Sequence, residues 1–151
     1  FYTQNAHLFQ NGAVNVIPPK SGHYDISINP ALFEMLLINL ATNAFKYNDS
    51  SDPSLSIQFE RKTQDIVIRF VDNGIGIERS QSQKIFKKFY QVGDSNLVSA
   101  KGSGLGLYLV QNIVRAHQGK INVRSDGKGQ GATFIVTLPL SKVRERVKNN
   151  G

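Results

Sequence analysis

The sequence predicts an α+β fold: a two-layer α/β sandwich in which about three helices cover one face of a mixed, mostly antiparallel sheet of about five strands. Three observations predict it. Residues 30–47 repeat apolar side chains at helical spacing, residues 55–70 contain two alternating runs, and residues 107–138 read as a helix followed by a hairpin. A chain of 151 residues suits one domain with a single core.

The helix over residues 30–47 is predicted by its cap and by its apolar stripe. Asn29 followed by Pro30 is typical of an N-cap and a first helical position. The polar run 48–53 then predicts the end of the helix and a loop. Residues 13–17 and 24–28 precede the helix and are expected to form short strands. The apolar positions recur every fourth residue: Leu32, Leu36, Leu40 and Ala44.

The later elements alternate in the same way. Runs at residues 55–59 and 66–70 predict a hairpin with one buried face. Residues 79–101 are polar and charged, with a loose stretch at 93–101. The apolar-periodic segment 107–117 predicts a helix capped by Gly119. A last hairpin is expected from strands at 120–124 and 132–138. The chain therefore divides into a lead-in (1–29), a core (30–140) and a basic tail (141–151).

Composition excludes several classes of function. The chain has no cysteine, which excludes disulfides, thiolate catalysis and zinc–thiolate sites and suits a reducing cytoplasm. No apolar run is long enough to cross a membrane, so we expect no membrane contact by this segment. The net charge of +7 suits phosphates or an acidic partner, but no aromatic residues are interleaved with the basic ones, so we expect no nucleic acid. The only methionine is Met35, which indicates that the chain is a piece of a longer protein. A membrane anchor elsewhere in that longer protein is compatible with this segment.

Four polar residues lie on one side of the first predicted helix: Asn39, Asn43, Lys46 and Tyr47. This side borders the stripe that must face the core, where each polar group needs a partner. Magnesium accepts one or two protein oxygens together with phosphate oxygens, so an amide oxygen beside an ammonium fits a magnesium–triphosphate. Ordinary polar residues that solubilise the end of a helix would show the same pattern.

Two glycine-containing segments add to this. Asp72 ends a strand and is followed by Gly74 and Gly76, so a carboxylate acceptor for an exocyclic amine stands where backbone can approach closely. A strand-ending turn would also use these residues. Residues 102–107, GSGLGL, precede a helix and expose backbone N–H groups to an anion next to Lys101, without the spacing of a P-loop or a dinucleotide fold.

Taken together and in order, these segments resemble the ATP-binding catalytic domain of histidine kinases, in the superfamily with gyrase, a heat-shock chaperone and MutL. The likeness covers residues 30–140 and implies the Bergerat ATP-binding fold. The matching runs are 39–47 (NLATNAFKY, an N box), 72–77 (DNGIGI, a first glycine box), 85–90 (IFKKFY, an F box), 102–107 (a second glycine box) and 131–134 (GATF, in the closing strand).

The resemblance implies a role for each matching residue. Asn43 would coordinate Mg²⁺ with Asn39 beside it, both Asn39 and Lys46 being candidate catalytic residues. Asp72 would accept the adenine amine, supported by Thr133. Residues 79–101 would form a mobile ATP lid anchored by Phe86 and Phe89. The remaining expected contacts to ATP are Lys46, Tyr47, Gly74, Gly76, Ile77, Phe89, Lys101, Gly102, Gly104, Leu105, Gly106 and Leu107.

The reaction expected from the resemblance is transfer of the γ-phosphate to a histidine of a separate dimerisation and acceptor domain, with a response regulator downstream. Hydrolytic relatives carry a glutamate where this chain has Asn39, and an amide cannot act as a base, so we expect little ATP hydrolysis. None of the three histidines precedes an acidic residue as kinase acceptors do. The fragment itself is expected to be monomeric.

One departure from the family pattern leaves alternatives open. Many relatives carry an arginine directly after the F box, where this chain has Gln91. Loss of that charge weakens stabilisation of the transition state unless Lys87, Lys88 or Lys101 replaces it. The alternatives are an ATP-binding docking or regulatory module with little phosphotransfer, and a serine kinase of the anti-sigma type.

Overall fold

The computed structural model describes residues 12–18, 26–91 and 102–140, and the remaining ranges are left undescribed. Five strands form one sheet in the order β1-β2-β3-β5-β4. The pair β1–β2 is parallel and the other three pairs are antiparallel, which confirms a mixed, mostly antiparallel sheet. The elements are β1 (Ala13–Ile17), α1 (Pro30–Lys46), β2 (Ser54–Arg61), β3 (Asp65–Asp72), η2 (Lys84–Phe86), α2 (Gly106–Ala116), β4 (Lys120–Arg124) and β5 (Ala132–Pro139).

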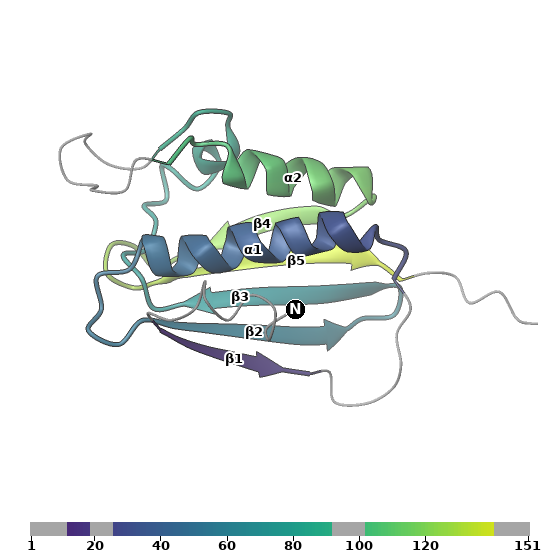
Figure 1. Ribbon diagram of the computed structural model, residues 1–151, viewed down its shortest axis with the longest axis horizontal. Helices are drawn as coiled ribbons and strands as arrows, with labels where there is room; N and C mark the ends of the chain where they lie inside the picture. The colour runs from purple at the N-terminus through teal and green to yellow at the C-terminus, as the bar shows by residue number, and fades with distance from the viewer. Residues whose placement is uncertain (1–11, 19–25, 92–101, 141–151) are drawn as a thin grey trace, which may run out of the picture.

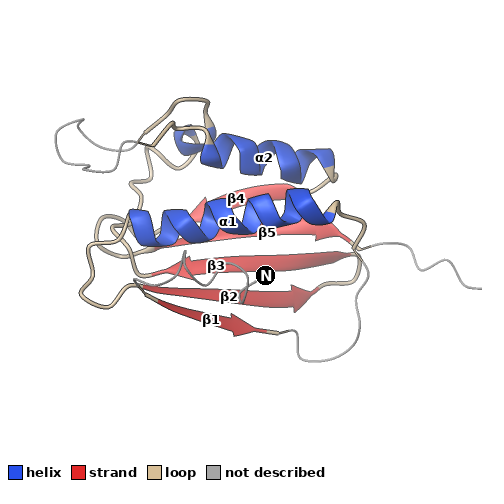
Figure 2. Ribbon diagram, viewed as in Figure 1, coloured by secondary structure: helices blue, strands red, loops and turns tan. Residues whose placement is uncertain are grey.

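Both α-helices lie on the same face of the sheet, which confirms the two-layer α+β architecture (Figures 1 and 2). The helices run in opposite directions. The end of α1 and the start of α2 therefore lie at the same edge of the molecule, where β3 ends and β5 begins (Figure 1).

Helix α1 begins at Pro30 as predicted and ends at Lys46, one residue before the predicted end, with Tyr47 as its C-cap. The Asn29 side chain accepts hydrogen bonds from the amides of Ala31 (3.0 Å) and Leu32 (3.2 Å), two of the N–H groups that a helix leaves unpaired at its start. The amide of Tyr47 closes the last turn on Asn43 O at 3.0 Å. The buried stripe that faces the sheet comprises Leu36, Leu37, Leu40, Ala41 and Ala44.

The core lies between this stripe, α2 and the inner face of the sheet. Alternate residues of β5 are buried, as a half-buried strand requires, and Phe134 packs edge-on against Phe86 with ring centroids 6.4 Å apart. Phe86 therefore fixes η2 to the sheet. The buried strand residues on this face are Leu55, Ile57, Ile66, Ile68, Phe70, Ala132, Phe134, Val136 and Leu138.

Three expectations about the elements need correction. In the described part of 24–28, Ile26 makes only an isolated bridge to Leu140, because no further pairing extends it into a strand. The expected third helix is the single 3₁₀ turn Lys84–Phe86. Helix α2 ends at Ala116 with His117 as its C-cap, and Gln118 rather than Gly119 adopts the left-handed conformation (φ 59°). The lead-in at 1–11, the end of the lid at 92–101 and the tail at 141–151 lie outside the described residues.

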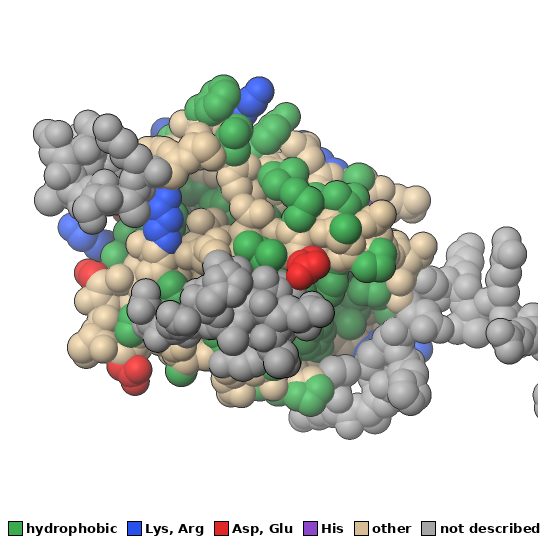
Figure 3. All heavy atoms as spheres, viewed as in Figure 1, with side chains coloured by type: hydrophobic (Ala, Val, Ile, Leu, Met, Phe, Trp, Pro, Cys, Tyr) green, Lys and Arg blue, Asp and Glu red, His purple; other side chains and the backbone are tan. Residues whose placement is uncertain are grey.

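Apolar side chains reach the surface at several places on the face that carries the helices (Figure 3). Within the described ranges, none of the helices has the length and apolar character that a membrane span requires. Among the described residues, the large apolar side chains that stay exposed are Val16, Ile17, Met35, Phe89 and Tyr108.

Candidate functional site

Three segments that are far apart in the sequence meet at one edge of the molecule. They are the second half of α1, the loop after β3, and the start of α2. Two adjoining cavities open between them, and they share five lining residues: Asn43, Tyr47, Ile85, Tyr90 and Leu107. Because these residues line both cavities, the two adjoin, and together they make up one groove between the three segments.

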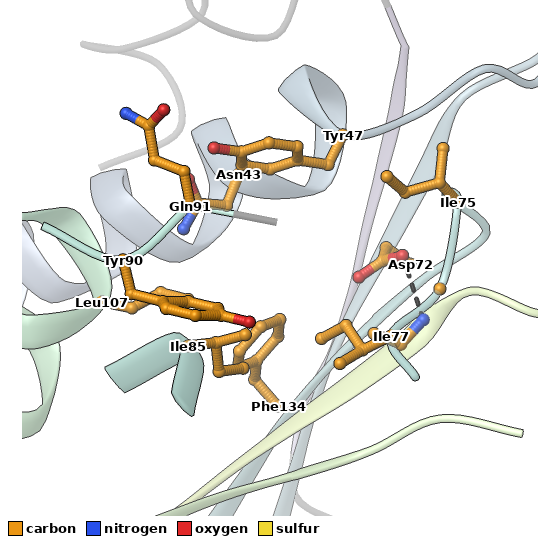
Figure 4. A pocket seen from close by; sticks show the side chains of 12 residues that line it. Asn43, Tyr47, Asp72, Ile75, Ile77, Ile85, Tyr90, Gln91, Leu107 and Phe134 are labelled. Atoms are coloured by element: carbon orange, nitrogen blue, oxygen red, sulfur yellow. Dashed lines mark hydrogen bonds between the residues drawn. The ribbon is translucent and has the colours of Figure 1, made fainter. Parts of the chain in front are cut away.

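The first cavity is largely apolar and contains one carboxylate. It encloses about 600 Å³ of space, its open mouth included. The carboxylate of Asp72 points into it among the apolar side chains (Figure 4). The apolar walls come from Ile75, Ile77, Ile85, Leu107, Ala132 and Phe134.

Backbone amides hold Asp72 in place. Its Oδ1 atom accepts hydrogen bonds from Gly74 N (2.9 Å) and from Ala132 N (3.1 Å). Among the described residues nothing donates to Oδ2, so this oxygen is available to a ligand. Burial raises the pKa of the Asp72 carboxyl, and the two amide hydrogen bonds act in the opposite direction. The site therefore presents one fixed acceptor in apolar surroundings.

The second cavity is polar and lies along α1. It encloses about 620 Å³ including its mouth, and its lining includes Asn39, Asn43 and Lys46 as well as the loop before α2. The side chain of Asn43 makes no hydrogen bond to the described part of the protein, so its amide oxygen can bind a hard cation. In the same described residues no cluster of three or more His, Cys, Asp or Glu side chains offers another metal site.

Lys46 and the glycine loop give this cavity its positive character. The ammonium of Lys46 lies 5.0 Å from the centroid of the Tyr47 ring and lies against Gly102. Helix α2 begins at Gly106, and its N-cap residue Leu105 provides no capping side chain. The free N–H groups of the first turn and the helix dipole therefore favour an anion here.

Asn39 and Gly106 bring the two helices together. Asn39 Nδ2 donates to Met35 O at 2.8 Å, and a Cβ on Gly106 would lie 2.7 Å from Asn39 Oδ1. Only glycine fits at such a distance without displacing the amide. The polar floor of the cavity thus depends on the absence of a side chain at position 106.

Most of the residues expected in the site line the groove. The first cavity includes Asn43, Tyr47, Asp72, Gly76, Ile77 and Leu107, and the second includes Asn39, Asn43, Lys46, Tyr47, Gly102, Gly104, Gly106 and Leu107. Gly74 lies beneath the groove, where a Cβ would collide with Tyr47 O, and Leu105 is the N-cap of α2. Lys101 is outside the described residues.

Two expected site residues point elsewhere. Phe89 is 66% exposed and adopts a positive φ of 64°, while its neighbour Tyr90 lines both cavities. Phe89 is therefore not the second anchor of the 79–91 segment. Thr133 lies in a hollow beside Arg124 and lines neither cavity, because successive strand residues face opposite sides of the sheet. The hydrogen bond that β5 donates to Asp72 comes from the amide of Ala132.

The sequence reasoning missed part of the apolar wall. Ala132 and Phe134 alternate with Thr133 and share the buried face with Val136, which is a period of two that the sequence already contains. Ile75 and Tyr90 carry no such signal, since they lie in irregular segments. Gln91 also lines the first cavity, and its side-chain amide donates to the carbonyl oxygen of Gly102.

The chain is similar to proteins of one known family. The family model for histidine kinase-, DNA gyrase B- and HSP90-like ATPases matches residues 28–142. The sensor protein RprX of Bacteroides fragilis is 36% identical over 91% of this chain and 29% of its own length. The autoinducer 2 sensor kinase/phosphatase LuxQ of Vibrio parahaemolyticus is 38% identical over 83% of this chain and 15% of its own length. The chain thus spans less than a third of the length of these relatives.

Solved structures share the fold at low sequence identity. The catalytic domain of histidine kinase ThkA superposes with a TM-score of 0.74 at 21% identity, covering 91% of this chain and 88% of that one. The mycobacterial sensor histidine kinase MprB gives a TM-score of 0.69 at 21% identity, covering 86% and 81%. The arrangement of one sheet and two covering helices is therefore common to these chains.

Proposed function

Because the chain belongs to the family of histidine kinase-, DNA gyrase B- and HSP90-like ATPases, we propose that it binds Mg²⁺–ATP and donates the γ-phosphate to a histidine on a separate acceptor domain. One observation carries the proposal: a single groove has an apolar end with one fixed carboxylate and a polar end with an ammonium, free amides and the start of a helix. That sequence of environments matches a purine joined to a polyphosphate.

The apolar end suits adenine. The base would pack between Ile77, Leu107 and Phe134, and its exocyclic amine would donate to Asp72, whose Oδ1 is held by two amides. A carboxylate only accepts hydrogen bonds, and guanine presents a carbonyl where adenine has this amine. The pairing therefore favours adenine over guanine.

The polar end suits a triphosphate with its metal. Asn43 would provide one oxygen ligand to Mg²⁺ and phosphate oxygens and water the others, an arrangement typical of this ion. A bound Mg²⁺ neutralises charge on the phosphates during transfer. Lys46 and the amides at the start of α2 would hold and orient the phosphate chain.

Asn39 bears on the fate of the γ-phosphate. It lines the polar cavity, but an amide does not take a proton from water at neutral pH, and its Nδ2 is engaged by Met35 O. The groove therefore favours binding and transfer over hydrolysis. We expect the acceptor to come from outside this chain. His117, the one histidine in the described ranges, lies at the far end of α2 with both ring nitrogens in hydrogen bonds, and neither His7 nor His23 precedes an acidic residue.

The relatives named as sensor kinases support a histidine acceptor and, downstream, a response regulator as partner. A second function is favoured by one observation: Gln91 is uncharged and its amide is engaged with Gly102, so it adds no charge at the phosphates. A chain of this kind would bind ATP as a docking or regulatory module with little transfer. A serine kinase of the anti-sigma type remains a third alternative.

An autophosphorylation assay with radiolabelled ATP distinguishes these functions. The full-length protein, or this chain with a supplied acceptor-helix domain, is incubated with Mg²⁺–ATP. We expect an acid-labile, base-stable phosphohistidine on the acceptor. Tight ATP binding with no transfer would favour the docking module, and an acid-stable phosphoserine on a partner would favour the serine kinase. Absence of ATP binding would refute all three.

A further inference from the structure

The loop from Gly74 to Ile77 forms one wall of the apolar cavity but is held from outside. Ile75, Gly76 and Ile77 line the cavity. Their backbone groups bond to other segments: Ile75 N donates to Tyr47 O at 3.0 Å, and Ile75 O accepts from Gly129 N at 2.6 Å. The position of this wall is therefore set by its neighbours, chiefly the turn between β4 and β5.

Ser125 lies at the centre of these connections. Its Oγ accepts a hydrogen bond from Ile77 N at 3.0 Å and donates to Gly131 O at 2.6 Å. It also accepts a longer bond from Gly127 N at 3.3 Å. A hydroxyl has one proton to donate and two lone pairs, so these three bonds use its full capacity. One hydroxyl thus joins the wall, the turn and the start of β5.

The wall and the turn are also in direct steric contact. Gly76 has a φ of 74°, and a Cβ there would collide with Gly127 O. Gly131 N donates to Gly74 O at 3.0 Å on the other side of the same contact. A shift of the turn must therefore shift the wall, because no side chain or gap separates them.

We infer that Ser125 is a positioning residue: its hydroxyl fixes the β4–β5 turn to Ile77 and so places the wall against which the adenine base packs. The inference rests on the proposed function. Ser125 itself does not line the apolar cavity, so it acts through Ile77. It is only partly buried, so water can replace the lost bonds in a variant, and the fold tolerates the change.

The test compares Ser125→Ala, Ser125→Thr and the control Ser56→Ala in the full chain. Ser56 is partly buried like Ser125 and its hydroxyl also accepts a hydrogen bond, from the Gln58 side chain, but it lies in β2, outside the cavity. ADP with Mg²⁺ is titrated by calorimetry, and amide hydrogen exchange is followed by NMR in the empty proteins. Thermal unfolding reports whether each variant is folded.

We expect Ser125→Ala to weaken ADP binding about three- to tenfold, the value of one ordinary hydrogen bond. The amide of Ile77 should exchange at least about tenfold faster, while the amide of Ile68 in β3 keeps its protection. Ser125→Thr, which retains the hydroxyl, should restore both values, and Ser56→Ala should change neither.

Three results overturn the inference. Unchanged ADP affinity in Ser125→Ala, with clear binding by the parent, overturns it and leaves the proposed function standing. Faster exchange that extends to Ile68 with a lower melting temperature indicates general destabilisation and overturns the specific role. If the parent protein gives no heat with ADP, the proposed function fails and this inference fails with it.

Discussion

The backbone amide of Ala132 donates a hydrogen bond to Asp72 Oδ1 at 3.1 Å, so strand β5 orients the carboxylate that points into the apolar cavity. Gly74 N holds the same oxygen at 2.9 Å. Both amides donate to Oδ1, so Oδ2 remains available to a ligand in the groove. Because the two oxygens have separate roles, a substitution can change what Asp72 offers a ligand and still keep the hydrogen bonds from Gly74 and Ala132.

Asp72→Asn should weaken ADP binding and leave the fold intact. The asparagine Oδ1 can still accept from Gly74 and Ala132, while its NH₂ group faces the adenine amine, donor against donor. We expect a cost of about 1–3 kcal/mol in binding, measured by calorimetry, with an unchanged or slightly higher melting temperature because no charge is buried. If the parent and the variant bind ADP and GDP alike, the adenine assignment is wrong.

Nucleotide affinity should fall at acidic pH, and from a higher pH than an ordinary aspartate would give. Burial raises the pKa of Asp72 above the usual 3.8, so its carboxylate becomes protonated, and stops accepting from the adenine amine, at a higher pH. Calorimetry with ADP from pH 7 downward measures this loss. Asp72→Asn is the control, since its affinity should lack this acidic component.

The raised pKa of Asp72 affects folding stability in the opposite direction: acidification weakens nucleotide binding but stabilises the fold. A raised pKa means that the folded state binds the proton more tightly than the unfolded chain. The contribution of Asp72 to stability is therefore complete below the unfolded pKa and is lost as the pH rises through the folded pKa. We expect the difference in unfolding free energy between Asp72→Asn and the parent to shrink as the pH falls. A difference that grows on acidification would contradict the raised pKa.

Asn43→Ala should abolish magnesium-dependent nucleotide binding. Its side chain lines both cavities and has no partner among the described residues, so its removal takes away an oxygen ligand and little internal stability. ADP titrations with and without Mg²⁺ measure the effect, and Asn112→Ala, an exposed helical asparagine of α2, is the matched control. Equal affinity in Asn43→Ala and the parent would remove Asn43 from the site.

Tyr90→Ala and Phe89→Ala should differ although the residues are adjacent. Tyr90 lines the groove, whereas Phe89 is exposed and turned away by its positive φ. Loss of the Tyr90 ring should cost about 1 kcal/mol in ADP binding, and loss of the Phe89 ring should cost nothing measurable. Calorimetry on both variants decides this. A larger loss for Phe89→Ala would restore Phe89 to the site.

This pair of aromatic residues marks where sequence reasoning stops. The helix of residues 30–46 and the two hairpins are predictable because local periodicity and caps determine them. The side to which Phe89 or Tyr90 turns depends on the positive φ of Phe89 and on its contact with Gly104. A Cβ added at Gly104 would lie 2.7 Å from the carbonyl carbon of Phe89. Such a contact between loops has no periodic signal. Thr133 differs, since the alternation of Ala132, Phe134 and Val136 already places it on the other face.

The left-handed residue after α2 is Gln118 and not the expected Gly119, and stability measurements can test this. Gln118 adopts φ 59°, which costs a residue with a Cβ more than it costs glycine, so Gln118→Gly should stabilise the fold by about 0.5–1 kcal/mol. Gly119 is not left-handed, but a Cβ there would lie 2.5 Å from Thr137 O, so Gly119→Ala should destabilise it. Urea unfolding of the two variants measures both effects. If Gly119 were the left-handed cap, Gln118→Gly would be neutral or destabilising, because glycine would then add only disorder to the unfolded chain.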